Sequence, residues 1–340
     1  MYPFYLGIDL HLKRTYLVLM NQAGEIIDEQ RLENAEVANY LKEKVPHRTY
    51  AVMEATRNWP FMYDLLCDHV ERVELAHPKK VKAIAHAAVK TDQIDAGVLA
   101  HLARLNYLPT AYAAPKEVRD LRWYTRHRKW LVEQRTQAKN RIRAVLASYD
   151  LASSVRNLFG VRGREILEDI LPKLRPAGQR VIEDHLAIIV QLDQQIKTLE
   201  KEIPLTEEQK QKVKLLNSMP GIHKVTAMTL LAEIGDISRF HSPKSLCNWA
   251  GLTPRVRKSD AIVRHGRISK QGSRYLRGAM VQAATVAYRF SPRWGQVHER
   301  IARRCGRSSA KTALARHMLT VIYYMLKRNQ PYQEDYPRGA

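Results

Sequence analysis

The chain has 340 residues, with 56 Lys and Arg against 34 Asp and Glu, which gives a formal net charge of +22 and a pI near 10.0. This length allows two domains with full hydrophobic cores, and the positive excess makes nucleic acid the leading ligand class. A membrane surface is the rival, but the sequence has no apolar run of the roughly 18 to 20 residues that a membrane span needs.

The amino terminus and the cysteines indicate a cytoplasmic protein. No basic segment precedes the first apolar residues, so the start of the chain does not resemble a signal peptide. Cys67, Cys247 and Cys305 are far apart and odd in number, which fits neither a zinc site nor a disulfide framework. We expect reduced thiols that pack inside the protein.

Two predicted strands near the amino terminus end in an acid. Three β-rich runs predict an antiparallel meander, and a fourth strand follows: Tyr5–Asp9, Thr15–Met20, Glu25–Arg31 and Thr49–Glu54. Asp9 and Glu54 close the first and fourth runs, so both carboxylates can reach one end of a sheet. A hard divalent cation is the usual means of relieving their repulsion.

A helix that begins after Thr91 supplies two more acids. Thr91 is a suitable cap, and Asp92 and Asp95, three residues apart, share a face of this helix. Four clustered acids suit a pair of Mg²⁺ or Mn²⁺ ions that act on a phosphodiester. The alternative is that these are ordinary capping and surface acids.

The intervening segments complete an α/β layer, which we assign to residues 1–114. Helices are predicted at 58–69 and from His77, and strands at 71–76 and 109–113. Strands alternating with helices predict an α/β domain.

The next segment, 115–204, is predicted to be a basic helical domain. From Lys116 to Asp150 the chain has ten Lys or Arg and four Asp or Glu. Because a solvated face usually mixes charges, this excess favours contacts with phosphates. The candidates are Arg119, Arg122, Arg126, Lys129, Lys139 and Arg143. A near-heptad apolar seam at 181–203 needs a partner helix, either in the same chain or in another subunit.

The last segment, 205–340, is predicted to be mainly helical. Residues 215–235 indicate two helices around a Pro-Gly turn, a hairpin that can bind a DNA phosphate. A helix capped by Ser242 follows, and the closing helices are predicted at 275–288 and 311–327. After the helix capped by Ser242, the stretch from Gly251 to Gly278 contains eight Lys or Arg and one acid, and it is predicted to be a loop that leads into the first closing helix. Its nucleic-acid-binding candidates are Arg255, Arg257, Lys258, Arg264, Arg267, Lys270 and Arg274.

Ser259 lies within this basic loop. A serine hydroxyl can attack phosphorus where cations stabilise the developing charge. A simple contact with phosphate is the alternative, since Ser269 and Ser273 have comparable sequence surroundings.

Six motifs in order resemble the DEDD transposases of bacterial insertion sequences, whose relatives include Piv-type DNA invertases and bridge-RNA-guided recombinases. The motifs are Gly7–Asp9, Met53–Thr56, Lys90–Ala96, Met219–Ile222, Gly251–Arg255 and Ile268–Gly272. Their order and spacing cover nearly the whole chain.

The resemblance implies a RuvC-like, ribonuclease-H-type domain whose acids Asp9, Glu54, Asp92 and Asp95 bind Mg²⁺ or Mn²⁺. It implies that Ser259 becomes covalently attached to DNA, and that a noncoding guide RNA selects the donor and target DNA. It also implies a homo-oligomer in which the acids of one subunit complete the serine site of another. The chain departs from the family pattern at Asp260 and His223, where glycine is common.

The leading hypothesis is therefore a site-specific DNA recombinase or transposase. The main alternative is a metal-dependent, structure-specific endonuclease that uses water as the nucleophile. A catalytically inactive nucleic-acid-binding module is a third class. A sugar-kinase-like ATPase is a fourth, but the sequence has no later Gly-rich phosphate loop to support it.

Overall fold

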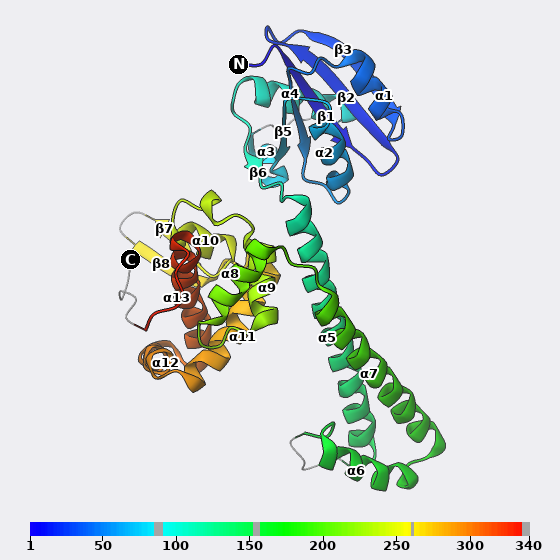
Figure 1. Cartoon of the computed structure of the whole chain (residues 1–340), viewed down its shortest axis with the longest axis vertical. Coiled ribbons are helices and arrows are strands. Elements are labelled where there is room, and N and C mark those ends of the chain that lie inside the picture. Colours follow the sequence, from blue (N-terminus) through cyan, green and yellow to red (C-terminus); the bar gives the residue numbers. More distant parts are fainter. Residues whose placement is uncertain (85–90, 152–156, 260–261, 335–340) are drawn as a thin grey trace. The chain divides into compact units, whose positions relative to one another are not determined.

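The structure of the protein, a computed structural model, describes residues 1–84, 91–151, 157–259 and 262–334, and the side chains of 257–265 lie outside that description. The chain divides into two compact units, Met1–Ala114 and Pro115–Ala340 (Figure 1). Across the described ranges, no helix combines the length and the apolar character needed to cross a membrane.

The first unit is built on one mixed, six-stranded sheet with the strand order β3-β2-β1-β4-β5-β6. The strands β1, β2 and β3 form an antiparallel meander, β1, β4 and β5 run parallel, and β6 returns antiparallel to β5. Their bounds are β1 Phe4–Leu10, β2 Arg14–Asn21, β3 Ile26–Glu33, β4 Thr49–Glu54, β5 Arg72–Ala76 and β6 Thr110–Ala111. All six strands predicted from the sequence are present, and their ends shift by no more than two residues.

Helices cover both faces of this sheet. Successive side chains of β1 point to opposite faces, so they pack against different helices. Leu6, Ile8 and Leu10 pack in the core formed with α1 (Val37–Lys44) and α2 (Trp59–Cys67). Tyr5 packs on the opposite face, in the core formed with α3 (Pro78–Ile84) and α4 (Asp92–Arg104). Successive strand residues face opposite sides, so Gly7 and Asp9 share the α4 side with Tyr5. Helix α1 has no counterpart among the helices predicted from the sequence.

The second unit begins with two long helices that lie side by side (Figure 1). Helix α5 (Lys116–Ser148) matches the predicted basic helix, and α7 (Pro176–Glu202) folds back along it. The predicted seam faces α5, because Leu192 and Ile196 pack against Leu131. The seam partner is therefore in the same chain. The short α6 (Val161–Ile170) and the 3-10 turn η1 (Leu171–Lys173) connect the two helices.

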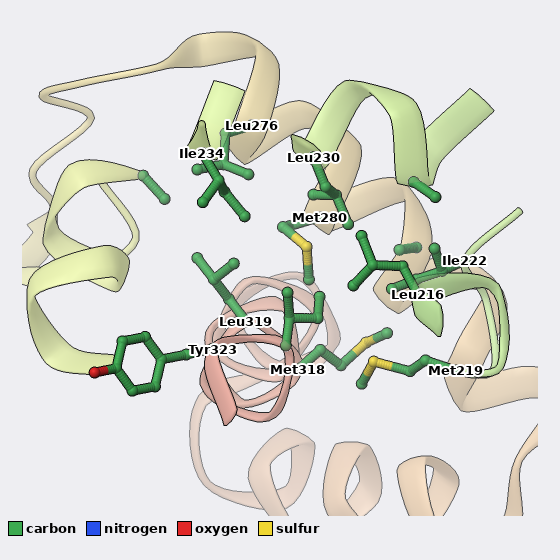
Figure 2. Close-up of a cluster of buried hydrophobic side chains, with 14 of the residues drawn as sticks. Leu216, Met219, Ile222, Leu230, Ile234, Leu276, Met280, Met318, Leu319 and Tyr323 are labelled. Carbon is green, nitrogen blue, oxygen red and sulfur yellow. The ribbon is translucent and has the colours of Figure 1, made fainter. Parts of the chain in front are cut away.

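The remaining helices surround one large core, part of which Figure 2 shows. Side chains of α8, α9, α11 and α13 meet there, including Leu216, Leu230, Met280 and Met318. The elements are α8 Glu207–Asn217, α9 Lys224–Ile234, η2 Ile237–Arg239, α10 Pro243–Trp249, β7 Pro254–Ser259, β8 Ile262–Ile268, α11 Arg274–Phe290, α12 Pro292–Cys305 and α13 Arg307–Arg328. The predicted cap is present, because Ser242 accepts a hydrogen bond from the Ser245 N–H.

The prediction of a loop for the basic stretch from Gly251 to Gly278 is wrong, because part of this stretch forms the antiparallel hairpin β7–β8. Ser259 is the last residue of β7 and pairs with Ile262. The β-branched residues Val256, Ile262 and Val263 favour strands, but the surrounding arginines obscure that signal in the sequence. Helix α12 also has no counterpart among the predicted helices.

Candidate metal centre and nucleic-acid surface

The end of β1 brings an acid and a histidine to the face covered by α4. Asp9 is the penultimate residue of the strand, and His11 follows the strand by one residue. Gly7, on the same face, allows α4 to approach closely, since a Cβ at this position would lie 1.9 Å from the Ala96 carbonyl oxygen. The glycine therefore sets the distance between the end of β1 and the acids of α4.

The first turn of α4 carries Asp92 and Asp95. Thr91 begins the helix, and its hydroxyl accepts a hydrogen bond from the Ile94 N–H, as the sequence predicts. The acids are favoured at this position because the amino end of a helix carries partial positive charge.

Three side chains converge at this point of the first unit. The Nε2 atom of His11 lies 3.1 Å from Asp9 Oδ2 and 3.3 Å from Asp92 Oδ1. One donor atom from each of Asp9, His11 and Asp92 lies within 4.8 Å of the others. The Asp9 side chain is 17% exposed and Asp92 43%, so the group is open to solvent on the helix side.

Burial raises the pKa of the Asp9 carboxyl above its ordinary value of 3.8. The neighbouring His11 lowers this pKa, whereas the charges of Asp92 and Asp95 raise it. The two α4 carboxylates are thus close enough to repel a charge on Asp9. A bound cation would reverse this electrostatic cost.

Glu54 ends β4, the parallel neighbour of β1. The register pairs Ile8 with Met53, so Asp9 and Glu54 are the next residues on adjacent strands. Glu54 and Asp95 are not members of the three-residue group described above. The structure thus brings Asp9 and Asp92 directly together, places Glu54 at the end of the neighbouring strand β4, and places Asp95 in the same first turn of α4 as Asp92.

The donor set fits a divalent cation. Carboxylate oxygens are ligands for Mg²⁺ and Mn²⁺, while an imidazole nitrogen shifts preference toward transition metals. His11 is absent from the sequence prediction, which considered only acids. The signal that could have identified it is its spacing of two from Asp9, because residues i and i+2 point to one face at the end of a strand.

Several of the predicted nucleic-acid-binding residues of α5 hold the second unit together. Arg122 donates through Nε to the Ala232 carbonyl oxygen at 2.6 Å, at the carboxyl end of α9. Arg126 donates to both carboxylate oxygens of Glu233, a side chain only 2% exposed. Lys129 pairs with Glu133 on the same helix.

Toward the other end of α5, Lys139 and Arg143 both lie over the ring of Phe159, each 5.1 Å from its centroid. The half-buried Arg119 lies in the first turn of the helix.

The basic residues between the start of β7 and the start of α11 whose side chains the structure describes are exposed. Arg255, Arg267, Lys270 and Arg274 are exposed, and Arg274 lies 4.9 Å from the centroid of the Tyr275 ring. The side chains of Arg257, Lys258, Ser259 and Arg264 lie outside the described part of the chain, as does Asp260. The other notable family departure, His223, is the N-cap residue of α9.

The two other serines of this region have different surroundings. Ser273 caps α11 by accepting a hydrogen bond from the Leu276 N–H, and its hydroxyl donates to Glu233 Oε2 at 2.8 Å. The Ser269 hydroxyl is buried without a hydrogen-bond partner among the described residues. The Ser269 hydroxyl is therefore shielded from solvent, and the Ser273 hydroxyl is engaged in two hydrogen bonds.

Two family models match the chain. The DEDD transposase model of IS110 elements, described as a transposase, matches residues 6–150. The model described as the transposase IS116/IS110/IS902 family matches residues 213–299. The first match spans most of the first unit and the start of the second, and the other match lies within the second unit.

Similar proteins extend this match along the chain. The transposase for insertion sequence element IS1111A of Coxiella burnetii is 25% identical, over 96% of this chain and 91% of the relative. A probable family 20 transposase of Pseudomonas aeruginosa is 24% identical, over 96% and 98%. The pilin gene-inverting protein of Moraxella bovis is 34% identical over 43% of this chain and 45% of its own length. The chain therefore belongs to the IS110-type DEDD transposases of insertion sequences, a family of enzymes that act on DNA.

Proposed function

We propose that this chain is a site-specific recombinase that moves an insertion sequence by cutting and rejoining DNA through a serine–DNA bond, with a divalent-metal centre in its first unit. The observation that carries the proposal is the convergence of Asp9, His11 and Asp92 within 4.8 Å. In a chain of the transposase family, such a group is best explained as a site that acts on a phosphodiester. The name of the pilin gene-inverting proteins, two similar proteins of Moraxella, supports DNA recombination as the reaction of this chain.

The first unit is proposed to be RuvC-like. Its strand order, with three antiparallel strands leading into the parallel β4 and β5, supports a ribonuclease-H-type fold. Asp9, Glu54, Asp92 and Asp95 would hold Mg²⁺ or Mn²⁺, and His11 adds a nitrogen donor. The ion, when bound, would supply positive charge to phosphoryl oxygens. The carboxylates would provide the negatively charged oxygen ligands, fixed in position by β1, β4 and α4.

Ser259 is proposed to be the nucleophile. Its Oγ would form a bond to phosphorus while the bond from phosphorus to the leaving strand oxygen breaks, and the serine proton would leave as that oxygen gains one. A hydroxyl end of the new partner strand would then attack the same phosphorus and release the serine. One phosphoester bond replaces another in each step, so the exchange needs no external energy source. The burial of Ser269 and the capping role of Ser273 favour Ser259 among the three serines.

The basic residues of α5 and of the β7–β8 hairpin are proposed to hold the DNA and a noncoding guide RNA. The net charge of +22 and the exposed Arg255, Arg267, Lys270 and Arg274 support this assignment. The acids and Ser259 belong to different units. We propose that a homo-oligomer pairs the acids of one subunit with the serine of another, with the basic helical hairpin acting as a separate connecting domain.

The test uses the purified full chain with labelled donor DNA, RNA transcribed from the element and Mg²⁺ or Mn²⁺. A denaturing gel and peptide mass analysis should detect a protein–DNA adduct on Ser259. The adduct should be lost in Ser259→Ala and kept in Ser269→Ala, the matched control. Asp9→Asn should abolish the adduct while DNA binding is kept.

Free cut ends from the wild type and from Ser259→Ala, without any adduct, would establish instead a metal-dependent nuclease that uses water. Full recombination by Asp9→Asn would remove the proposed role of the acids.

A further inference from the structure

Helix α5 exposes two tryptophans on one face. Trp123 is 76% exposed and Trp130 is 51% exposed. They are seven residues apart, a spacing that returns to the same side of an α-helix after two turns. Large aromatic side chains stabilise a protein chiefly when they are buried, so two exposed on one face indicate a binding surface.

The two rings belong to a hollow within the second unit. A pocket of about 550 Å³ is lined by Trp123, His127 and Trp130 of α5, together with Leu199 of α7 and Tyr275 of α11. Tyr124 and Arg126, both of α5, complete its lining. We name this the aromatic pocket.

The rings of the aromatic pocket are held in defined positions. His127 stacks on Trp130 with ring centroids 5.7 Å apart and planes inclined by 14°. The Tyr275 ring contacts two guanidinium groups, those of Arg126 at 4.8 Å and Arg274 at 4.9 Å from its centroid. The ion pair with buried Glu233 fixes Arg126 in turn. The Trp130 and Tyr275 rings of the surface are thus positioned before any ligand arrives.

The chemistry of the lining selects the ligand. Flat aromatic faces bind flat aromatic partners by stacking, and the described residues that line the pocket include the cation Arg126 and no carboxylate. A partner that combines a planar ring with a negative charge on each repeating unit is a nucleic-acid strand whose bases are unpaired. A base inside a duplex is stacked on its neighbours and cannot present its face to Trp123 or Trp130.

We propose that the aromatic pocket binds unpaired nucleotides of a single-stranded segment, with the bases stacked on Trp123 and Trp130 and a phosphate near Arg274, which is exposed beside Tyr275. The segment can come from an RNA or from a DNA strand separated from its complement. The proposal is independent of the metal centre and of Ser259, since it concerns holding a strand rather than cutting it.

The test measures binding of labelled single strands of about ten nucleotides, oligo-U and oligo-dT, to the full chain by fluorescence anisotropy. Trp123→Ala and Trp130→Ala should each weaken binding roughly tenfold, the effect expected from loss of one stacked base. Trp123→Phe should retain most of the affinity. The affinity for an abasic strand of the same length, which keeps only the phosphates, should be the same in all of these proteins.

The matched control is Phe290→Ala, which removes another aromatic ring of the same unit that is 79% exposed. This variant should bind oligo-U and oligo-dT as the wild type does. The stronger of the two wild-type affinities identifies whether RNA or DNA is the preferred source, and either preference supports the pocket.

Three results would overturn the proposal. The first is unchanged single-strand affinity in both alanine variants. The second is an equal loss for abasic strands or for duplex DNA, which would mean a general loss of charge contacts. The third is a change of oligomeric state in sedimentation with unchanged affinity, which would make this surface a subunit contact. Asp9→Asn should bind these strands normally, so failure of the metal centre leaves this test intact.

Discussion

Arg126 and Glu233 join two helices that are more than one hundred residues apart in the chain. Arg126 Nε donates to Glu233 Oε1 at 2.8 Å and its Nη2 donates to Oε2 at 3.1 Å. Glu233 is 2% exposed, whereas the Arg126 side chain is 40% exposed. The arginine therefore neutralises a carboxylate that has no access to water, and it aligns α5 with α9.

Arg126→Met should destabilise the second unit, because it leaves the Glu233 charge buried and without its cation. Solvent reaches the arginine, so we expect a loss of roughly 2 kcal/mol in the free energy of unfolding, less than for a fully buried pair. Urea denaturation of the full chain measures it. Lys129→Met, which removes an exposed pair one turn away, should change the unfolding free energy by less than about 0.5 kcal/mol. Equal effects of the two substitutions would contradict the role of Glu233.

Gly7→Ala should displace α4 and with it Asp92. The new Cβ would lie 1.9 Å from the Ala96 carbonyl oxygen and 2.8 Å from the Ala100 nitrogen, both of them backbone atoms. We expect a loss of roughly 2 kcal/mol or more in stability, together with weaker divalent-metal binding. Thermal unfolding and calorimetric titration with Mn²⁺ measure the two effects.

Gly97→Ala is the matched control on α4. A Cβ there meets nothing within 4 Å, so alanine should stabilise the helix by about 0.5 to 1 kcal/mol and leave metal binding unchanged. A Gly7→Ala variant that behaves like Gly97→Ala would show that α4 can move away from β1 without cost.

His11→Ala should weaken metal binding in the first unit. Its Nε2 atom lies between Asp9 and Asp92, where it either binds the ion or orients both carboxylates. Loss of such a group lowers metal affinity roughly 10- to 100-fold, and we expect the larger effect for Mn²⁺ because imidazole is a poor ligand for Mg²⁺. Calorimetry measures both ions, with His223→Ala in the other unit as the control. Unchanged Mn²⁺ affinity would exclude His11 from the centre.

Cys247 should make stability depend on pH in the alkaline range. Burial raises the pKa of its thiol above the ordinary value of 9.0, while the hydrogen bond with Thr320 and the charge of Arg316 lower it. The unfolded chain loses this proton above about pH 9, whereas the folded chain keeps it. The contribution of the Cys247 thiol to the free energy of unfolding is therefore fully present below about pH 9, and it is lost as the pH rises through the pKa of this thiol in the folded chain.

Comparing the unfolding of the wild type and Cys247→Ala at about pH 8 and pH 10 isolates this dependence. The wild type should lose more stability between the two pH values than the variant does. The expectation that all three cysteines pack inside the protein is correct for Cys247 alone, since Cys67 and Cys305 are exposed. In a thiol-labelling assay at about pH 8, these two should react first, and Cys247 only after unfolding. Rapid labelling of Cys247 would contradict its burial.

The strand signals near the amino terminus predict most of the first unit because they are local. Alternation along Tyr5–Asp9 fixes which side chains share a face, and Thr91 marks the start of α4. These features suffice to predict that Asp9 and Asp92 approach each other. They do not predict how closely α4 packs on β1. That distance depends on the absence of a side chain at Gly7, where a Cβ would collide with the backbone of α4.

The basic residues of α5 show what the sequence could not provide. The charge of Arg122 and Arg126 predicts contacts with nucleic acid, but both residues also contact α9. Their partners, Ala232 and Glu233, are more than one hundred residues away, and no local pattern connects them. The sequence does not predict the hairpin β7–β8 for a related reason, since the charged residues of its two paired strands hide their β preference.

The ion pairs of α5 also bear on how nucleic-acid binding responds to salt. Each phosphate neutralised on duplex DNA releases counterions, and the logarithm of the binding constant falls by about 0.9 per contact for each unit of log salt concentration. Arg126, Arg128, Lys129 and Arg135 already hold acids of the second unit: Glu233, Glu200, Glu133 and Asp193. The salt slope of binding therefore reports the cations that remain for phosphate, and it is shallower than the arginines and lysines of the sequence suggest.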